Sequence, residues 1–326
     1  MTMRTAFCLA ALTASALAQT SDPWFSTFSI IAWNPDTKEL GVAVESRAFG
    51  AGAAVPYAIP GIGAVATQAA ANRLYGAKAI TLLQKGLTPA EVVKRITDED
   101  TGRDSRQVAV IDIQGRSAVF TGKTTLTHVF AGHVTGKNFS VQGNTLAGEE
   151  VVKAVAATYE STKGSMAERF MAALVAGQSK GGDRRGMQSA GILVVRPIPP
   201  GSDSTVERVV DIRVDDAVDP FKELRRLLNL TMAGTHAQQS AQLAKESKFA
   251  DALAEQKQAV EMNPRNEGTH YALAQRYTQN HEFVNAIVEL REALTIQKNL
   301  REQASADPVF APLRDFVEFK RLIQTP

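Results

Sequence analysis

The distribution of strand-like segments constrains the fold of this chain more than any other feature. Short apolar segments typical of strands recur up to Val214 and stop after Pro220, where only helical patterns follow. Before Pro220, strands and helices occur in groups instead of alternating one by one. Grouped elements are typical of antiparallel sheets layered with helices. The sequence therefore predicts an α+β domain followed by an all-α region.

The first two expected strands are separated by the turn sequence Asn34-Pro35-Asp36-Thr37. Because Pro and Asn favour tight turns, these strands are predicted to form an antiparallel hairpin. A turn about Asp36 and Thr37 places Thr27 opposite Ser46, with a slip of one residue left open. Thr88 is predicted to cap a helix that begins at Pro89. The expected strands cover 28–33, 40–44, 63–67, 107–113, 117–121, 190–196 and 208–214, and further helices are expected over 149–159 and 165–176.

The all-α region contains small residues that recur with a period of 34 residues. Ala252 and Ala259 have counterparts in Ala286 and Ala293. This resembles about two tetratricopeptide repeats, and a generic helical bundle is the alternative. Because two repeats do not bury their stacked face, we expect the region, with capping helices over 307–323, to dock on the first domain or on a second copy of the chain. The expected domains are 27–228 and 237–326, with the helical repeats binding a protein partner or forming a homo-oligomer.

The N-terminus has the features of a secretory signal peptide. A basic start at Arg4 precedes an apolar run over 6–17, and Ala16-Leu17-Ala18 matches a cleavage site. The alternative, a buried amphipathic helix, would need a polar stripe that this run lacks. We expect residues 1–18 to be removed and the protein to be exported, to the periplasm or the extracellular space. The one cysteine, Cys8, lies in this segment, so the mature chain has no thiol chemistry and no disulfide.

Composition excludes several classes of protein. The 326 residues include 36 Lys and Arg against 34 Asp and Glu, a balance that does not fit a nucleic-acid binder. An apolar content of 44% without a long apolar run beyond the signal predicts no integral membrane span. The glycine pattern at Gly61, Gly63 and Ala66 precedes a strand, not the helix that dinucleotide binding needs. The five His residues show no zinc-binding spacing. The sequence therefore predicts neither a cofactor nor a metal.

Five sequence blocks with polar and glycine residues recur along the first domain. They are Thr27-Phe28-Ser29-Ile30, Gly41-Val42-Ala43-Val44-Glu45-Ser46, the segment 61–68, the segment 139–144 and the segment 182–189. Taken together and in this order, the blocks resemble the bacterial and archaeal family called domain of unknown function 1028 (DUF1028). The resemblance covers residues 27–228 and implies a fold like that of N-terminal-nucleophile hydrolases, a four-layer αββα sandwich. Family members without a signal often begin Met-Thr-Phe-Ser, which implies that Thr27 is the candidate nucleophile.

The chemistry of an N-terminal threonine supports this role. Its α-amine, with a pKa of roughly 7.7–8.0, accepts the hydroxyl proton near neutral pH without a histidine. Ser46 is expected to hydrogen-bond that amine, and Arg47 to favour its neutral form through charge repulsion. Asn144 is expected to donate a hydrogen bond to the oxyanion of the tetrahedral intermediate. The alternatives are a polar pair at a sheet edge for Ser46 and Arg47, and a turn residue for Asn144.

Four other polar residues of these blocks are candidates for substrate binding: Gln68, Asp183, Arg184 and Gln188. For Asp183 and Arg184 the alternative is a solvated turn with an ion pair.

The predicted function is an exported amide-bond hydrolase that acts through Thr27 on a small amide or peptide. The alternative is a catalytically silent sandwich whose helical repeats bind a ligand or protein. Because eight residues separate the signal from Thr27, the hydrolase needs a second cleavage between Ser26 and Thr27.

Overall fold

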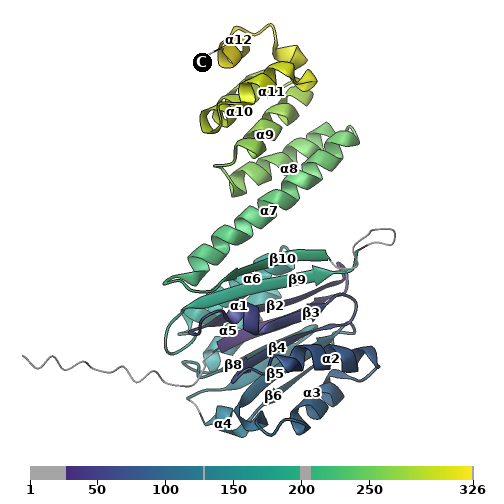
Figure 1. Cartoon of the computed structure of the whole chain (residues 1–326), viewed down its shortest axis with the longest axis vertical. Coiled ribbons are helices and arrows are strands. Elements are labelled where there is room, and N and C mark those ends of the chain that lie inside the picture. The colour runs from purple at the N-terminus through teal and green to yellow at the C-terminus, as the bar shows by residue number, and fades with distance from the viewer. Residues whose placement is uncertain (1–26, 128, 199–206, 325–326) are drawn as a thin grey trace, which may run out of the picture.

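The computed structural model describes residues 27–127, 129–198 and 207–324. The predicted signal peptide, residues 1–18, and the segment 19–26 lie outside the described residues. Figure 1 shows two sheets with helices packed on them at one end of the molecule and a group of helices at the other end. The mixed α and β architecture followed by a helical region agrees with the sequence analysis.

The larger sheet has six strands within the described residues, and each strand runs antiparallel to the strands beside it. The predicted hairpin is confirmed, and Thr27 pairs with Ser46. On its other side, β1 pairs with β8, which places Asn144 beside Thr27. The order is β10 (Glu207–Val214), β9 (Ser189–Arg196), β2 (Glu39–Ser46), β1 (Thr27–Asn34), β8 (Phe139–Asn144) and β7 (Gly132–Gly136).

The smaller sheet has four described strands and faces the larger one across an apolar layer. Its order is β3 (Pro56–Ile59), β4 (Gly63–Ala69), β5 (Arg106–Asp112) and β6 (Ser117–Thr121). Helices cover the outer faces of both sheets. On the larger sheet these are α5 (Glu149–Ser161) and α6 (Met166–Ser179), and on the smaller one α2 (Leu74–Gln84) and α3 (Pro89–Asp98). Short helical segments are α1 (Ala51–Ala54), η1 (Arg103–Ser105) and α4 (Lys123–Leu126).

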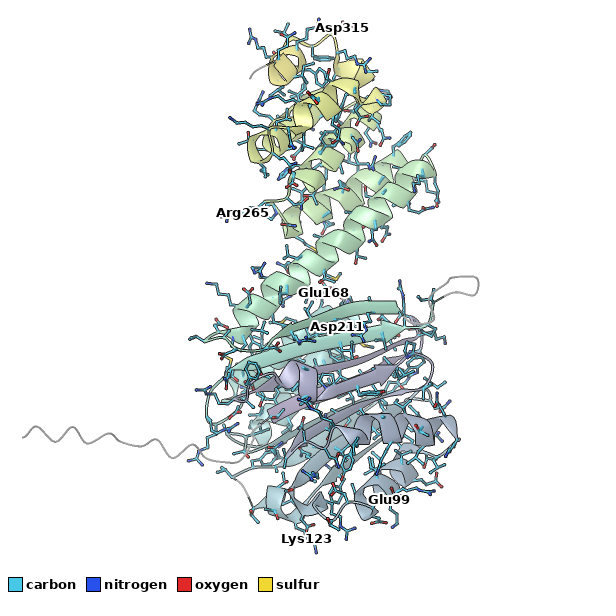
Figure 2. The ribbon with its side chains drawn as sticks, in the orientation of Figure 1. Glu99, Lys123, Glu168, Asp211, Arg265 and Asp315 are labelled. Carbon is cyan, nitrogen blue, oxygen red and sulfur yellow. The ribbon has the colours of Figure 1, made fainter. Side chains whose placement is uncertain are left out.

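Strand alternation decides which side chains face which layer. Along β1, Ile31 and Trp33 enter the layer between the sheets, whereas Phe28 and Ile30 pack under the helices of the larger sheet. This is the period of two expected for a strand that is buried on both faces. Charged side chains such as Glu99 and Lys123 lie on the outside (Figure 2).

Capping residues fix where two of these helices begin. Thr88 caps α3 and exchanges hydrogen bonds with Glu91, and Pro89 occupies the first turn as predicted. Ser165 and Glu168 form the same reciprocal cap on α6. Such boxes satisfy two backbone N–H groups that would otherwise lack partners, so local sequence sets these boundaries.

Three strands were not among those expected, namely β3, β7 and β8. β3 begins with Pro56 at the sheet edge. β7 consists of five half-exposed or exposed residues, of which the first and the last are glycines. Neither segment has the apolar run that marks a strand. β8 is fully buried, but its polar residues and glycine interrupt the apolar pattern by which a buried strand is recognised.

A single helix, α7 (Pro220–Lys245), connects the sheets to the helical region. Its first turns place Phe221, Leu224 and Leu228 in the core under the larger sheet, and its second half packs against α8. The expected division between residues 228 and 237 therefore falls inside a continuous helix. Between residues 228 and 237 the chain has no Pro, and its one Gly, Gly234, is tolerated inside a helix.

The remaining helices extend away from the sheets (Figure 1). The bounds of α10 follow those of α8 at an offset of 34 residues, and Ala252, Ala259, Ala286 and Ala293 are all buried. Within the described residues, no helix is long and apolar enough to cross a membrane. The elements are α8 (Phe249–Met262), α9 (Glu267–Gln279), α10 (Phe283–Ile296), α11 (Leu300–Ala306), η2 (Pro308–Leu313) and α12 (Val317–Gln324).

Candidate functional site

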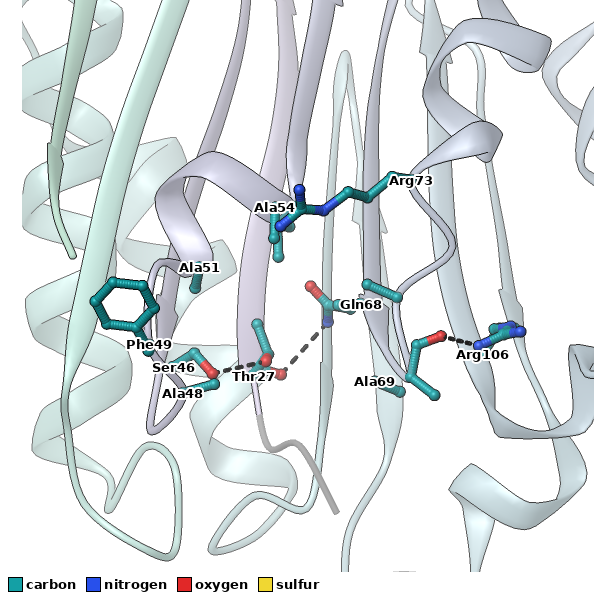
Figure 3. A pocket seen from close by; sticks show the side chains of 13 residues that line it. Thr27, Ser46, Ala48, Phe49, Ala51, Ala54, Gln68, Ala69, Arg73 and Arg106 are labelled. Atoms are coloured by element: carbon teal, nitrogen blue, oxygen red, sulfur yellow. Dashed lines mark hydrogen bonds between the residues drawn. The ribbon is translucent and has the colours of Figure 1, made fainter. Parts of the chain in front are cut away.

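A cavity of about 370 Å³ opens where β1 begins and where β2 and β4 end. It lies between the two sheets and contains three of the residues predicted from the sequence, namely Thr27, Ser46 and Gln68 (Figure 3). The other described residues that line it are Ala48, Phe49, Ala51, Ala54, Val55, Ala69, Ala70, Ala71, Arg73 and Arg106. We call this cavity the Thr27 pocket.

Thr27 and Ser46 meet at the base of the Thr27 pocket. Their register places them side by side at the end of the hairpin, and the Oγ1 atom of Thr27 lies 2.9 Å from the Oγ atom of Ser46. Both residues are buried. The contact joins the two hydroxyl groups, and either group can donate the proton. The structure therefore places a second hydroxyl directly against the candidate nucleophile.

Gln68 fixes the backbone of Thr27 from the opposite sheet. Its Nε2 atom lies 3.4 Å from the carbonyl oxygen of Thr27 and 2.8 Å from Oε1 of Gln107, and it donates to both. Its Oε1 atom accepts a hydrogen bond of 2.6 Å from the Ser29 hydroxyl. Because its amide is engaged on both sides, Gln68 acts in the structure as a positioning residue that crosses between the sheets.

Asn144 is adjacent to Thr27 in the sheet, but its side chain does not line the Thr27 pocket. Its Nδ2 atom donates to Oε1 of Gln107 at 3.1 Å. Gln107 in turn donates from Nε2 to the carbonyl oxygen of Gly143 at 3.0 Å and to the Thr121 hydroxyl at 3.0 Å. Asn144 is therefore a member of a buried amide network behind the pocket, centred on Gln107, which sequence reasoning did not single out.

Arg47 points away from the Thr27 pocket. β2 ends at Ser46, and Arg47 lies in the bend that follows the strand. The exposed guanidinium donates from Nη1 to Oε1 of Gln188 at 3.0 Å. Gln188 also donates to Asp216 and, through its backbone N–H, to the carbonyl oxygen of Ser46. The geometry joins Arg47 to Gln188, and neither residue lines the pocket.

Asp183 is buried, in contrast to the solvated turn considered as an alternative, and its ion pair is with Arg185, not with Arg184. Its carboxylate accepts hydrogen bonds from the backbone N–H groups of Arg47 at 2.7 Å and Arg185 at 2.8 Å. The side chain of Arg184 is exposed and makes no hydrogen bond or ion pair within the described residues. Asp183 thus ties its loop to the end of β2, next to Ser46.

Two arginines of the Thr27 pocket were not predicted. Arg73 is exposed and extends toward Ala54 above Gln68, and Arg106 lies on the far side of Ala69 (Figure 3). Arg106 donates to Asp100 at 3.1 Å and to the carbonyl oxygen of Ala70. Arg106 begins β5 and Arg73 immediately precedes α2, both far from Thr27 in the sequence, so no local sequence signal relates them to it.

Asp100 stabilises the position of Arg106. Burial raises the pKa of the Asp100 carboxyl, but hydrogen bonds from Tyr75, Gly102, Asn72 and Arg106 outweigh burial and hold that pKa well below its usual range. The Asp100 carboxylate is therefore charged at neutral pH, where it pairs with the Arg106 guanidinium.

Two features of the backbone shape the wall of the Thr27 pocket. Ala69 has a φ of 63°, in the left-handed region that residues other than glycine rarely adopt, and it turns the chain at the end of β4. On the other side, the Ser189 hydroxyl accepts a 3.0 Å hydrogen bond from the N–H of Ala51 and donates to the carbonyl oxygen of Ala48. These bonds hold the segment that carries Phe49, which is 74% exposed at the pocket.

Glu45 precedes Ser46 and faces the opposite side of the larger sheet. It is fully buried, and neither carboxyl oxygen has a hydrogen-bond partner within the described residues. Burial raises the pKa of Glu45 well above its ordinary value, the neighbouring Asp183 carboxylate raises it further, and Arg185 acts in the opposite direction. Its surroundings thus favour the uncharged form of the Glu45 carboxyl.

The described side chains include no group of three His, Cys, Asp or Glu residues placed to hold a metal ion. The Thr27 pocket consists instead of hydroxyl, amide, guanidinium and small apolar groups. This set suits acid–base and nucleophilic chemistry carried out by side chains and the backbone.

Comparison with known proteins relates the chain to a protein family and to a solved structure. Residues 27–224 match the family of unknown function DUF1028. The crystal structure of protein SPO2555 from Silicibacter pomeroyi, of the same family, is 30% identical, with a TM-score of 0.56; the match covers 62% of this chain and 84% of that one. The comparison with curated proteins yields no match.

Proposed function

We propose, since the chain belongs to the DUF1028 family of unknown function, that it is an exported amide-bond hydrolase whose nucleophile is the N-terminal Thr27 of its processed form. The observation that carries this proposal is the position of the Thr27 hydroxyl in the pocket, 2.9 Å from the Ser46 hydroxyl. The two facing antiparallel sheets with outer helices support a likeness to N-terminal-nucleophile hydrolases.

The reaction needs the bond between Ser26 and Thr27 to be cleaved, because an amide nitrogen does not act as a base. Once freed, the α-amine of Thr27 accepts the hydroxyl proton while Oγ1 attacks the carbonyl carbon of the substrate. The proton then passes to the departing amine, the C–N bond breaks, and an ester to Thr27 remains. Water hydrolyses this ester, and the proton it releases restores the hydroxyl group.

In this mechanism, the other residues of the site position Thr27. Either hydroxyl group can donate in their hydrogen bond; the mechanism uses the arrangement in which Ser46 donates, because the proton of the Thr27 hydroxyl is then free to reach the amine. Gln68 holds the Thr27 carbonyl, and Asn144 supports Gln68 through Gln107. Arg47, Asp183 and Gln188 order the loops below Ser46. Arg184 has no role in this scheme.

The helical region forms a second, non-catalytic part of the proposal, in which α7 to α10 are two tetratricopeptide-like repeats that bind a protein partner or a second copy of the chain. Two equivalent contacts support the repeat. Nδ1 of His236 lies 2.6 Å from Oε2 of Glu255, and Nδ1 of His270 lies 2.7 Å from Oε2 of Glu289. Both residues of the second pair follow their counterparts in the first pair by 34 positions.

Mass spectrometry and hydrolysis assays on the protein from its native compartment test the catalytic proposal. Active protein should begin at Thr27, and protein that retains Ser26 should be inactive. Thr27→Ala should lower the hydrolysis of a panel of small amides at least about a thousandfold, while Thr27→Ser retains part of the activity. The change removes the only atom that attacks the carbonyl carbon.

Thr37→Ala is the matched control, because Thr37 is an exposed threonine in the turn of the same hairpin. It should leave both processing and hydrolysis unchanged. A homogeneous population that begins at Gln19 and hydrolyses amides, or unchanged hydrolysis in Thr27→Ala, would overturn the assignment. Absence of hydrolysis from correctly processed protein would favour the silent sandwich with working helical repeats.

A further inference from the structure

We propose that the Thr27 pocket selects substrates that carry a carboxylate next to a small apolar group, with Arg73 as the group that recognises the anion. This substrate class makes the proposed hydrolase function more specific. Only the claim that such a molecule is cleaved rests on that proposed function. The binding preference stands on the charges and shape of the pocket itself.

The charged residues that line the pocket are all positive within the described part of the chain. Two arginines line it, and none of its described lining residues is acidic. Asp100, behind the pocket, balances Arg106. The side chain of Arg73 has no hydrogen bond or ion pair within the described residues. One positive charge thus remains uncompensated at the pocket, where it favours an anionic ligand.

The two arginines differ in how they are held. Arg106 is fixed by Asp100 and the Ala70 carbonyl, whereas Arg73 is an exposed side chain that reaches across the pocket from the start of α2 (Figure 3). A planar guanidinium forms two parallel hydrogen bonds to a carboxylate, and Arg73 has all its donors available for that purpose. Arg106, whose charge Asp100 balances, forms a fixed part of the pocket wall.

The remaining wall limits the size and polarity of the ligand. Phe49 and Val55 provide apolar surface, and the other apolar lining residues are alanines. A volume of about 370 Å³ lies at the small end of ligand pockets, which span roughly 300–1,000 Å³. Such a space suits a molecule about the size of a short acylated peptide with small side chains. A phosphorylated or polyanionic ligand would find only one unpaired cation.

The test measures binding separately from catalysis. The probes are N-acetyl-alanyl-alanine, which has a free carboxylate, and the same compound with a C-terminal amide, titrated into the full-length Thr27→Ala protein by calorimetry or NMR. We expect the carboxylate form to bind at least about tenfold more tightly, the usual scale of a charge-assisted hydrogen bond. The difference should shrink as salt is raised.

Arg73→Gln should abolish this preference, and Arg73→Lys should retain part of it. Arg265→Gln is the matched control, because Arg265 is another exposed arginine but lies in the helical region (Figure 2). Equal binding of the two probes, failure of both to bind, or a preference that persists in Arg73→Gln would overturn the proposal. A carboxylate preference without hydrolysis by the Thr27 protein would overturn only the catalytic assignment.

Discussion

The layer between the two sheets differs from one end to the other. At the end where β1 begins, buried hydroxyl and amide side chains face one another. Further along the same strands, the residues that point into the layer are apolar. The change from polar to apolar residues occurs in four strands. Thr27 and Ser29 give way to Ile31, Ser46 to Val44, and the other two strands change from Gln68 to Ala66 and from Gln107 to Ala109. We call these the polar end and the apolar end of the layer.

The difference shows how the sandwich accommodates a site in its interior. A buried polar group costs free energy unless it is hydrogen-bonded, and amides such as Gln107 meet that need by bridging several partners. Apolar packing gains free energy without such requirements. We infer that the apolar end stabilises the fold and that the polar end holds the chemistry.

The largest expected effect on stability belongs to the apolar end. Ile31→Ala removes a side chain that is fully buried between the sheets, and it should lower the free energy of unfolding by about 2–5 kcal/mol through lost burial and the cavity that remains. Chemical denaturation measures this loss. Hydrolysis assayed below the new melting temperature should stay within a few-fold of wild type. A loss of activity comparable to that of Thr27→Ala would show that the two ends are not separable.

A smaller loss of stability, combined with a loss of activity, is expected at the polar end. Gln107→Leu removes the acceptor that Gln68 and Asn144 share, and it should lower the free energy of unfolding by about 1–3 kcal/mol. Because the amide of Gln68 then loses one of the hydrogen bonds that fix it, its hold on the Thr27 carbonyl weakens, and hydrolysis should also fall.

The control lies further along the same strand, where Ile111→Leu keeps the volume of an apolar side chain. It should cost less than about 1.5 kcal/mol and leave hydrolysis unchanged. If Gln107→Leu is as active as Ile111→Leu, the amide network is purely structural.

The smallest effect concerns Glu45, on the outer side of the polar end. Because its pKa is raised in the folded protein, its contribution to stability is fully present below the pKa of the unfolded chain and is lost as pH rises through the folded pKa. Glu45→Gln removes this loss and should stabilise the protein by about 1 kcal/mol near neutral pH, with little difference in acid. Melting temperatures of both proteins across pH 4 to 8 measure it; parallel curves would contradict it.

Sequence reasoning found the parts of the fold that local patterns encode. The turn at Asp36 set the register that pairs Thr27 with Ser46, and Thr88 marked the start of α3. Both depend on residues close together in the chain, where turn and cap preferences act.

The rest depends on contacts between distant segments. Arg73 and Arg106 enter the Thr27 pocket because the smaller sheet lies over the larger one, and no local pattern encodes that approach. Asp183 was a reasonable candidate for a surface turn, but the backbone N–H of Arg47, far away in sequence, binds it in the interior. Buried glutamines in apolar strands, such as Gln68 and Gln107, were the available sign of a polar interior.

The continuous helix α7 has a geometric consequence for the helical region. At 1.5 Å per residue its 26 residues span about 39 Å, so one rigid rod joins the core under the larger sheet to α8. Each residue of an α-helix also advances the azimuth by about 100°. The direction in which the helical region faces, relative to the mouth of the Thr27 pocket, is thus set by the number of residues between Leu228 and Ser240, and an insertion of one residue there would swing it about a quarter turn around the rod.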